Sequence, residues 1–153
     1  MILGIGCDIV KVARIRTLLE RGHWRSTYVA EKNRRTENTI RKIRKPDTIR
    51  FARFILSPTE LEAFKLRFFS AQKDSLDSEL PEKLALFLAG RWAAKEACYK
   101  AMSPHFKLHW SDVSILNVEG KPTIDLADHT LEKFGKLNSH VSISHDGGYA
   151  IAY

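Results

Sequence analysis

An alanine-rich segment with a proline near each end constrains the fold of this chain more than any other feature. Pro81 suits the first turn of a helix and Ser103-Pro104 stops one, so we predict a helix from about Pro81 to Met102. Its alanines are strong helix formers that keep the helix surface slim. Its first half carries large apolar residues and is predicted to lie in the core.

The second half of this helix carries charged residues on defined faces. At about 3.6 residues per turn, Glu96 and Lys100 share one face, and Arg91 and Lys95 lie beside it. A carboxylate with several cations nearby could hold a metal ion against a phosphate. The alternative is a solvent-facing Glu–Lys pair one turn apart, worth a few tenths of a kcal/mol. These residues alone leave both readings open.

The N-terminal segment MILGIGCDIV, residues 1–10, is predicted to be a buried strand because it is short and rich in β-branched residues. Gly4 and Gly6 alternate within it, which indicates that another backbone or a ligand approaches closely. Asp8 stands among apolar neighbours, where an ionised carboxylate needs a cation or hydrogen-bond donors. It could instead cap the helix that follows.

Charge favours an anionic partner. The chain has 25 Lys and Arg against 18 Asp and Glu, a net charge of +7. Residues 11–21 form an amphipathic pattern, with Arg14, Arg16 and Arg21 off its apolar stripe. Those arginines either form an ordinary charged face exposed to solvent or dock an acidic partner, and composition does not decide between the two.

The remaining pattern predicts one α+β domain over residues 1–153, an antiparallel sheet packed on the long central helix. Residues 30–47 are dense in Lys and Arg and almost bare of large apolar residues, which is typical of an extended basic insertion. The other predicted elements are a helix from Ser57-Pro58 to about Ala71, a hairpin over 111–126, a short helix over 127–137 and a hairpin over 140–153.

Several kinds of site are disfavoured. No His or Cys spacing suits zinc, and Cys7 and Cys98 are predicted to be reduced packing residues. Ser144 and His145 adjoin a glycine turn and could meet a ligand, but neighbours on a strand face opposite ways, which disfavours a Ser-His hydrolase. No P-loop is present, and no apolar run is long enough to span a membrane. If the carboxylates bind a metal together with the phosphates of a ligand, Mg²⁺ is the favoured ion, because it prefers oxygen ligands of this kind.

Five segments, in order, resemble the holo-acyl-carrier-protein synthases, which are small 4′-phosphopantetheinyl transferases. They are GIGCDIV from Gly4 with Arg14-Ile15, FARFILSPTE from Phe51, RWAAKEACYK from Arg91, Gly120-Lys121-Pro122, and VSISH from Val141. The resemblance implies Mg²⁺-dependent transfer of phosphopantetheine from coenzyme A to a serine of an acidic acyl carrier protein, releasing 3′,5′-ADP. It also implies a homotrimer with the nucleotide site between subunits.

The same resemblance implies a role for each candidate residue. Asp8 and Glu96 would ligate Mg²⁺, Lys100 would neutralise phosphate charge, and Glu96 or a metal-bound water held by it would deprotonate the carrier serine. Gly120 and Pro122 would lie near the adenine. The remaining candidates are Arg53, Arg91, Lys95, Ser144 and His145 for the nucleotide and its 3′-phosphate, and Arg14, Arg16 and Arg21 for carrier docking.

Two other functions remain open from composition. The basic segment could bind nucleic acid electrostatically, although residues 30–47 hold no aromatic side chain on which bases could stack. A non-catalytic domain that only binds the carrier is the third possibility. The basic insertion makes the chain look more like the fungal mitochondrial members of the family, so a mitochondrial matrix location is expected, with the cytoplasm as the alternative. No targeting peptide is apparent at the N-terminus, where strand-like sequence begins at Ile2.

Overall fold

The computed structural model describes residues 2–21, 45–70, 78–135 and 137–153. Most of the basic insertion predicted over 30–47 therefore lies outside the described residues. The elements in chain order are β1 (Asp8–Lys11), α1 (Val12–Arg21), α2 (Lys45–Ile55), α3 (Pro58–Phe69), α4 (Leu80–Met102), a 3₁₀ turn η1 (Trp110–Asp112), β2 (Val113–Val118), β3 (Lys121–Leu126), α5 (Asp128–Phe134), β4 (Ile143–Asp146) and β5 (Tyr149–Ala152).

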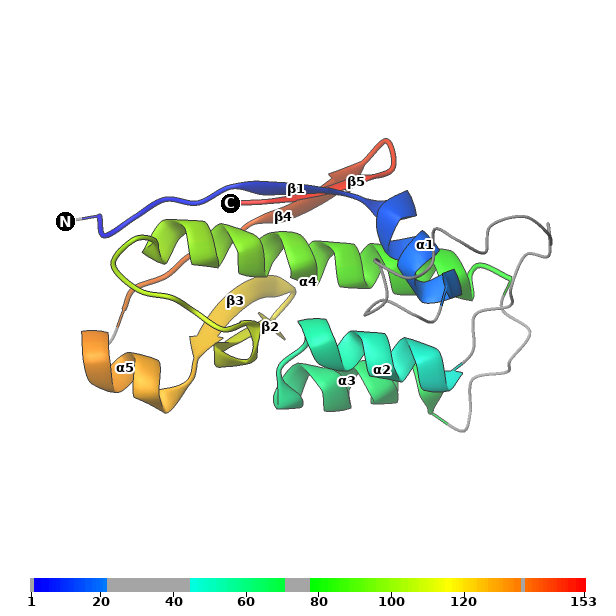
Figure 1. Ribbon diagram of the computed structural model, residues 1–153, viewed down its shortest axis with the longest axis horizontal. Helices are drawn as coiled ribbons and strands as arrows, with labels where there is room; N and C mark the ends of the chain where they lie inside the picture. The colour runs from blue at the N-terminus through cyan, green and yellow to red at the C-terminus, as the bar shows by residue number, and fades with distance from the viewer. Residues whose placement is uncertain (1, 22–44, 71–77, 136) are drawn as a thin grey trace, which may run out of the picture.

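The long helix α4 runs through the middle of the molecule between two layers. Strands β1, β5 and β4 form an antiparallel sheet along one side of α4, while the β2–β3 hairpin, α2 and α3 lie on the other side (Figure 1). The two sheets are separate, and every strand pair is antiparallel. The predicted α+β class with a central helix is confirmed, although the strands divide into two sheets rather than one.

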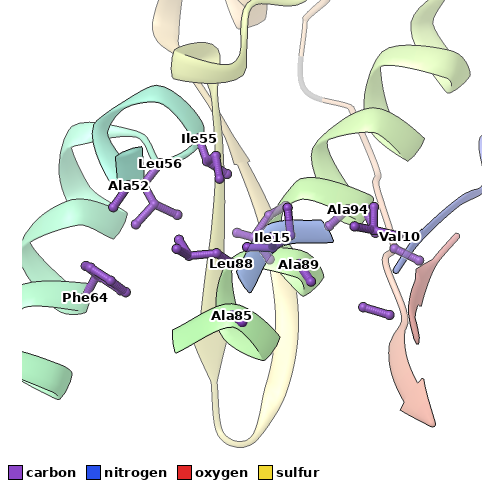
Figure 2. Packing of buried hydrophobic residues seen from close by; sticks show 14 of the residues in the cluster. Val10, Ile15, Ala52, Ile55, Leu56, Phe64, Ala85, Leu88, Ala89 and Ala94 are labelled. Atoms are coloured by element: carbon purple, nitrogen blue, oxygen red, sulfur yellow. The ribbon is translucent and has the colours of Figure 1, made fainter. Parts of the chain in front are cut away.

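The core gathers around the alanine-rich middle of α4. Ala85, Ala89, Ala93 and Ala94 are fully buried there, and their short side chains let neighbouring elements come close. Figure 2 shows apolar side chains of α1, α2 and α3, among them Ile15 and Phe64, converging on this region. Packing against neighbours supplies most of a helix's stability in a protein, and α4 is packed against elements on more than one side.

Two glycines allow the N-terminal segment to lie directly against α4. A Cβ atom added at Gly4 would stand 1.8 Å from the carbonyl oxygen of Ala101, and one added at Gly6 would stand 1.9 Å from that of Ala97. Real Cβ atoms do not approach so closely. The close backbone approach predicted from the alternating glycines is therefore confirmed, and the partner is the last two turns of α4.

Three local predictions need correction. Strand β1 covers only Asp8–Lys11, because residues before Asp8 have no strand partner within the described chain. Helix α2 was missed: its buried residues Thr48, Phe51 and Ile55 follow helical spacing, but they are scattered among polar residues at the end of the basic segment. Cys7 is exposed rather than packed, while Cys98 is half-buried.

The helix starts and stops were predicted well. Ser57 caps α3 in a capping box with Glu60, and Ser103 follows the last residue of α4. Among the described residues, no helix has both the length and the apolar character needed to cross a membrane.

The contact between Gly6 and α4 generates a test. We expect Gly6→Ala to lower the midpoint of thermal unfolding by several degrees, since the added methyl group would overlap the Ala97 carbonyl and push the strand away from the helix. The matched control is Gly90→Ala, also within reach of packed neighbours, where the new methyl would meet Ile143 Cγ2 at an ordinary 3.4 Å. Equal unfolding temperatures for the two variants would contradict the close approach.

Candidate functional site

A charge pair joins the N-terminal strand to the end of α4. The Lys100 Nζ atom lies 2.7 Å from Asp8 Oδ1 and also donates a hydrogen bond to the Cys7 carbonyl oxygen at 2.9 Å. Asp8 pairs with Ala152 in β5, on the face of the sheet that is buried against α4. The sheet register and the two glycines thus fix where the Asp8 carboxylate meets the helix.

Glu96 lies on the same helix face as Lys100, one turn earlier. The hydrogen bond that Lys100 donates to Asp8 raises the pKa of Lys100, and the negative charges of Asp8 and Glu96 raise it further. Lys100 therefore stays an ammonium at neutral pH, within the electrostatic field of both carboxylates. The structure brings Asp8 and Lys100 into direct contact although they are 92 residues apart (100 − 8), and Glu96 acts on the same ammonium through its charge.

The donor set suits a hard divalent cation. Mg²⁺ typically takes one or two carboxylates from the protein and leaves its other positions to water and phosphate oxygens. The carboxylates of Asp8 and Glu96 both stabilise the positive charge of the Lys100 ammonium, so this part of the surface already carries a cation beside two carboxylates. No cluster of three or more His, Cys, Asp or Glu side chains suited to a metal occurs among the described residues.

The side chain of Lys95 is not exposed to a nucleotide as the sequence had predicted, but lies in the core. Its side chain is 0% exposed, and its ammonium contacts Glu60 Oε2 at 2.6 Å and the Trp110 carbonyl oxygen at 2.8 Å. Burial lowers the pKa of Lys95, and the Glu60 carboxylate opposes that shift. In this chain Lys95 is part of a buried ion pair, so it does not offer a free cation to a nucleotide.

Arg91 sits between the core and the surface. Its side chain is 17% exposed, its Nε atom lies 3.4 Å from Glu60 Oε1, and its guanidinium stacks 4.6 Å from the centre of the Phe87 ring. Burial lowers the pKa of Arg91, with the charge of Glu60 acting in the opposite direction. Arg53, on the other hand, is exposed on α2. The two predicted phosphate-binding arginines therefore differ in how firmly the fold holds them.

The predicted adenine and phosphate residues of the C-terminal half are spread over two sheets. Gly120 is at the β2–β3 turn with φ of +83°, and Pro122 pairs with Asn117 in that hairpin. Ser144 and His145 are on β4, where β5 separates them from β1 and Asp8. Ser144 is aligned with Ile151 and His145 with Ala150, so the two side chains face opposite sides of the sheet, as predicted.

The three arginines predicted to dock a carrier lie on α1, but their surroundings differ. Arg14 stacks over the Trp92 ring of α4 at 5.2 Å, one helical turn before Glu96. Arg16 pairs with Glu20 at 3.0 Å and with Glu82 at 3.3 Å, so neighbouring carboxylates partly neutralise its charge. Arg21 is exposed at the end of the helix.

Sequence reasoning missed Glu60 as more than a helix-capping residue. Its carboxylate accepts hydrogen bonds from the backbone of Ser57 and Ile115, and it contacts Lys95 and Arg91. The capping-box spacing from Ser57 was visible in the sequence. The long-range partners were not, because nothing in the spacing places α3 beside α4.

A family model of the 4′-phosphopantetheinyl transferase superfamily matches residues 4–153. The chain is 33% identical to a holo-[acyl-carrier-protein] synthase of Hydrogenovibrio crunogenus over 159 residues, covering 100% of this chain and 94% of that protein. Among solved structures, it resembles an acyl carrier protein synthase of Plasmodium yoelii with ADP bound, with a TM-score of 0.64, 29% identity and coverage of 99% and 91%.

A second solved structure is similar over nearly its whole length. It is the holo-[acyl-carrier-protein] synthase of Helicobacter pylori in complex with coenzyme A, with a TM-score of 0.61, 27% identity and coverage of 97% of this chain and 95% of that one. The agreement in sequence and in fold extends to both ends of the described structure. The chain therefore belongs to the 4′-phosphopantetheinyl transferase superfamily and is an enzyme of the holo-acyl-carrier-protein synthase type.

Proposed function

We propose that this chain transfers 4′-phosphopantetheine from coenzyme A to a serine of an apo acyl carrier protein, with Mg²⁺ held by Asp8 and Glu96. The observation that supports this assignment most directly is the meeting of Asp8 with Lys100 at 2.7 Å, beside Glu96. Transfer at phosphorus depends mainly on positioning and on neutralising charge. The two carboxylates would hold Mg²⁺, and that ion together with the Lys100 ammonium would position the phosphates and neutralise their charge.

Each of the three residues has a distinct part in the proposed step. The Glu96 carboxylate takes the proton from the serine hydroxyl, and the serine oxygen forms a bond to the phosphorus that carries pantetheine. The bond from that phosphorus to the bridging oxygen of the pyrophosphate breaks, and 3′,5′-ADP leaves with the negative charge. Lys100 neutralises the phosphate oxygens, while Asp8 keeps its ammonium in place. When bound, Mg²⁺ would supply further neutralisation of the pyrophosphate.

We propose further that the coenzyme A site lies between two copies of the chain in a homotrimer. Within one chain, the strand order places β5 between β1, with Asp8, and β4, with Ser144 and His145. The outer face of this sheet carries exposed apolar side chains: Ile9 is 60% and Ile151 38% exposed, and the two are direct cross-strand partners. Tyr149 and Tyr153 continue the same face along β5 and its end. Contiguous exposed apolar residues of this kind mark an interface.

The carrier protein would dock on α1 beside the catalytic face of α4. Arg14 lies over Trp92 there, which places a cation next to the residues that act on coenzyme A. A carrier with an acidic recognition helix would be steered by the chain's net charge of +7. Since Arg16 is already paired with two carboxylates, Arg14 is expected to contribute more than Arg16.

A location of the protein in the mitochondrial matrix, with the cytoplasm as the alternative, stays a prediction that rests on the basic insertion. Cell fractionation of the source organism with an antibody against the chain would test it.

The direct test of the activity is the mass of an apo acyl carrier protein after incubation with this chain, coenzyme A and Mg²⁺. We expect the carrier to gain the mass of one phosphopantetheine group and an equal amount of 3′,5′-ADP to appear. A chelator should stop the reaction, and added Mg²⁺ should restore it. No mass gain with several apo carriers would refute the proposed transfer.

Glu96→Gln tests the proposed base and metal ligand. We expect kcat to fall by about 100-fold or more, as is typical when a general base is removed, with the unfolding temperature unchanged because Glu96 is only half-buried. Stabilisation of the protein by coenzyme A should also lose its dependence on Mg²⁺. Glu132→Gln, an exposed carboxylate on α5, is the control and should behave as wild type. Normal turnover in the Glu96 variant would rule out both roles.

Arg14→Glu tests carrier docking. We expect KM for the carrier to rise roughly tenfold, with KM for coenzyme A unchanged, because charge reversal at an interface affects mainly encounter and affinity. Lys65→Glu, on α3, changes the net charge equally and serves as the control. If both variants raised KM for the carrier to the same degree, only overall charge would matter, and the docking surface would have to lie elsewhere.

Ile151→Glu tests the proposed interface. A charge in the middle of the apolar sheet face should convert the trimer to a monomer in sedimentation velocity, and transfer activity should be lost with it. Leu66→Glu is the matched control, since Leu66 is 72% exposed on α3, away from this sheet. A trimer that survives Ile151→Glu, or a wild-type chain that sediments as a monomer, would contradict the interface.

A further inference from the structure

Glu60 is a buried charge whose carboxylate has partners on several elements. It belongs to the first turn of α3 and is 3% exposed. One carboxylate oxygen, Oε2, accepts from the Ser57 backbone N–H at 2.9 Å and contacts Lys95 Nζ at 2.6 Å. The other, Oε1, accepts from the Ile115 backbone N–H at 3.1 Å and faces Arg91 Nε at 3.4 Å. The carboxylate thus joins α3, α4 and β2.

The charges around Glu60 do not cancel. Lys95 is fully buried and takes the shorter contact, and its ammonium also donates to the Trp110 carbonyl oxygen at 2.8 Å. One carboxylate therefore neutralises one ammonium, and Arg91 is left as a second cation on the same carboxylate. The Nε atom of Arg91 is buried and makes no hydrogen bond within the described residues. The guanidinium of Arg91 is partly desolvated and stacks on the Phe87 ring.

A half-buried arginine held in this way is prepared for an anion. Contacts with the Glu60 carboxylate and the Phe87 ring fix the orientation of the Arg91 side chain. Little side-chain entropy therefore remains to be lost when a phosphate binds. Its positive charge is not fully compensated, so an anionic group would stabilise it. The ion pair with Lys95 holds the Glu60 carboxylate in position, and that carboxylate in turn orients Arg91.

We propose that Glu60, secured by Lys95, is a positioning residue that acts through Arg91 to set the affinity for the phosphates of coenzyme A. This inference rests on the proposed function, in which Arg91 contacts the nucleotide. It differs from the expectation for Lys95 drawn from the sequence, because the lysine here touches no substrate and works from inside the core. A purely structural ion pair would stabilise the fold without any effect specific to coenzyme A.

The test separates stability from positioning by removing both charges together. Glu60→Gln alone leaves the Lys95 ammonium buried without its carboxylate, which is destabilising, so a lower unfolding temperature is expected. The double variant Glu60→Gln with Lys95→Met removes both charges at similar volume and should recover most of that temperature. We nevertheless expect its KM for coenzyme A to stay raised by about tenfold, with kcat within about twofold of wild type, since Arg91 has lost its carboxylate.

A second cycle in an Arg91→Met background shows whether the effect passes through Arg91. We expect Arg91→Met alone to raise KM for coenzyme A, and the Glu60–Lys95 double variant to raise it no further in that background. Ser114→Ala is the control within the same buried network, because it removes the 2.8 Å hydrogen bond to Ser57 without touching Arg91. Its KM for coenzyme A should equal that of wild type.

The outcomes distinguish the inference from the function on which it rests. A KM that returns to wild type together with the unfolding temperature, or effects that add to those of Arg91→Met, would overturn the positioning role. An Arg91→Met variant with unchanged KM would instead refute the contact of Arg91 with the nucleotide. If the double variant does not fold, the same cycle is measured with Glu60→Gln alone below its unfolding temperature, where an additive effect again overturns the proposal.

Discussion

The contact between the N-terminal segment and the backbone carbonyl groups of α4 is the constraint on which the Asp8–Lys100 pair depends. Without side chains at Gly4 and Gly6, the segment lies against Ala97 and Ala101, and the next residues, Cys7 and Asp8, reach Lys100. A helix alone would present Glu96 and Lys100 as an ordinary pair on its surface. The strand adds a second carboxylate, which pairs with Lys100, and this arrangement is the basis of the proposed site for phosphate and Mg²⁺.

One helix performs two electrostatic tasks, and the difference between them is burial. At the C-terminal end of α4, Lys100 is about half exposed and its pKa is raised by the hydrogen bond with Asp8. In the middle, Lys95 is fully enclosed, and burial lowers its pKa. The first lysine is available to a substrate, and the second ties together α3, α4 and η1. The slim alanine surface of the helix permits both, because it lets the sheet and the α2–α3 pair pack close on opposite sides.

Much of the fold followed from local signals in the sequence. Pro81 and Ser103-Pro104 predicted the ends of α4 to within a residue or so, and Ser57 with Glu60 predicted the start of α3. Gly147 and Gly148 predicted the last turn, where both glycines have positive φ. Helix α2 escaped notice because its apolar residues are few and stand in a basic context. Long-range pairings, such as β1 with β5, had no local signal at all.

The sequence by itself determined the helices other than α2, the turns and, through its resemblance to a family, the class of reaction. The catalytic roles of Asp8, Glu96 and Lys100 stay a prediction from the same resemblance. Local propensities and short motifs act over a few residues, so they are legible in a linear chain. Only the tertiary structure decided which lysine is exposed and which is buried. Lys95 and Lys100 are five positions apart on one helix (100 − 95), and their fates differ because Glu60 comes from another helix and Asp8 from a strand. Burial and pairing are properties of the packed molecule, since residues distant in sequence supply the partner and exclude the water.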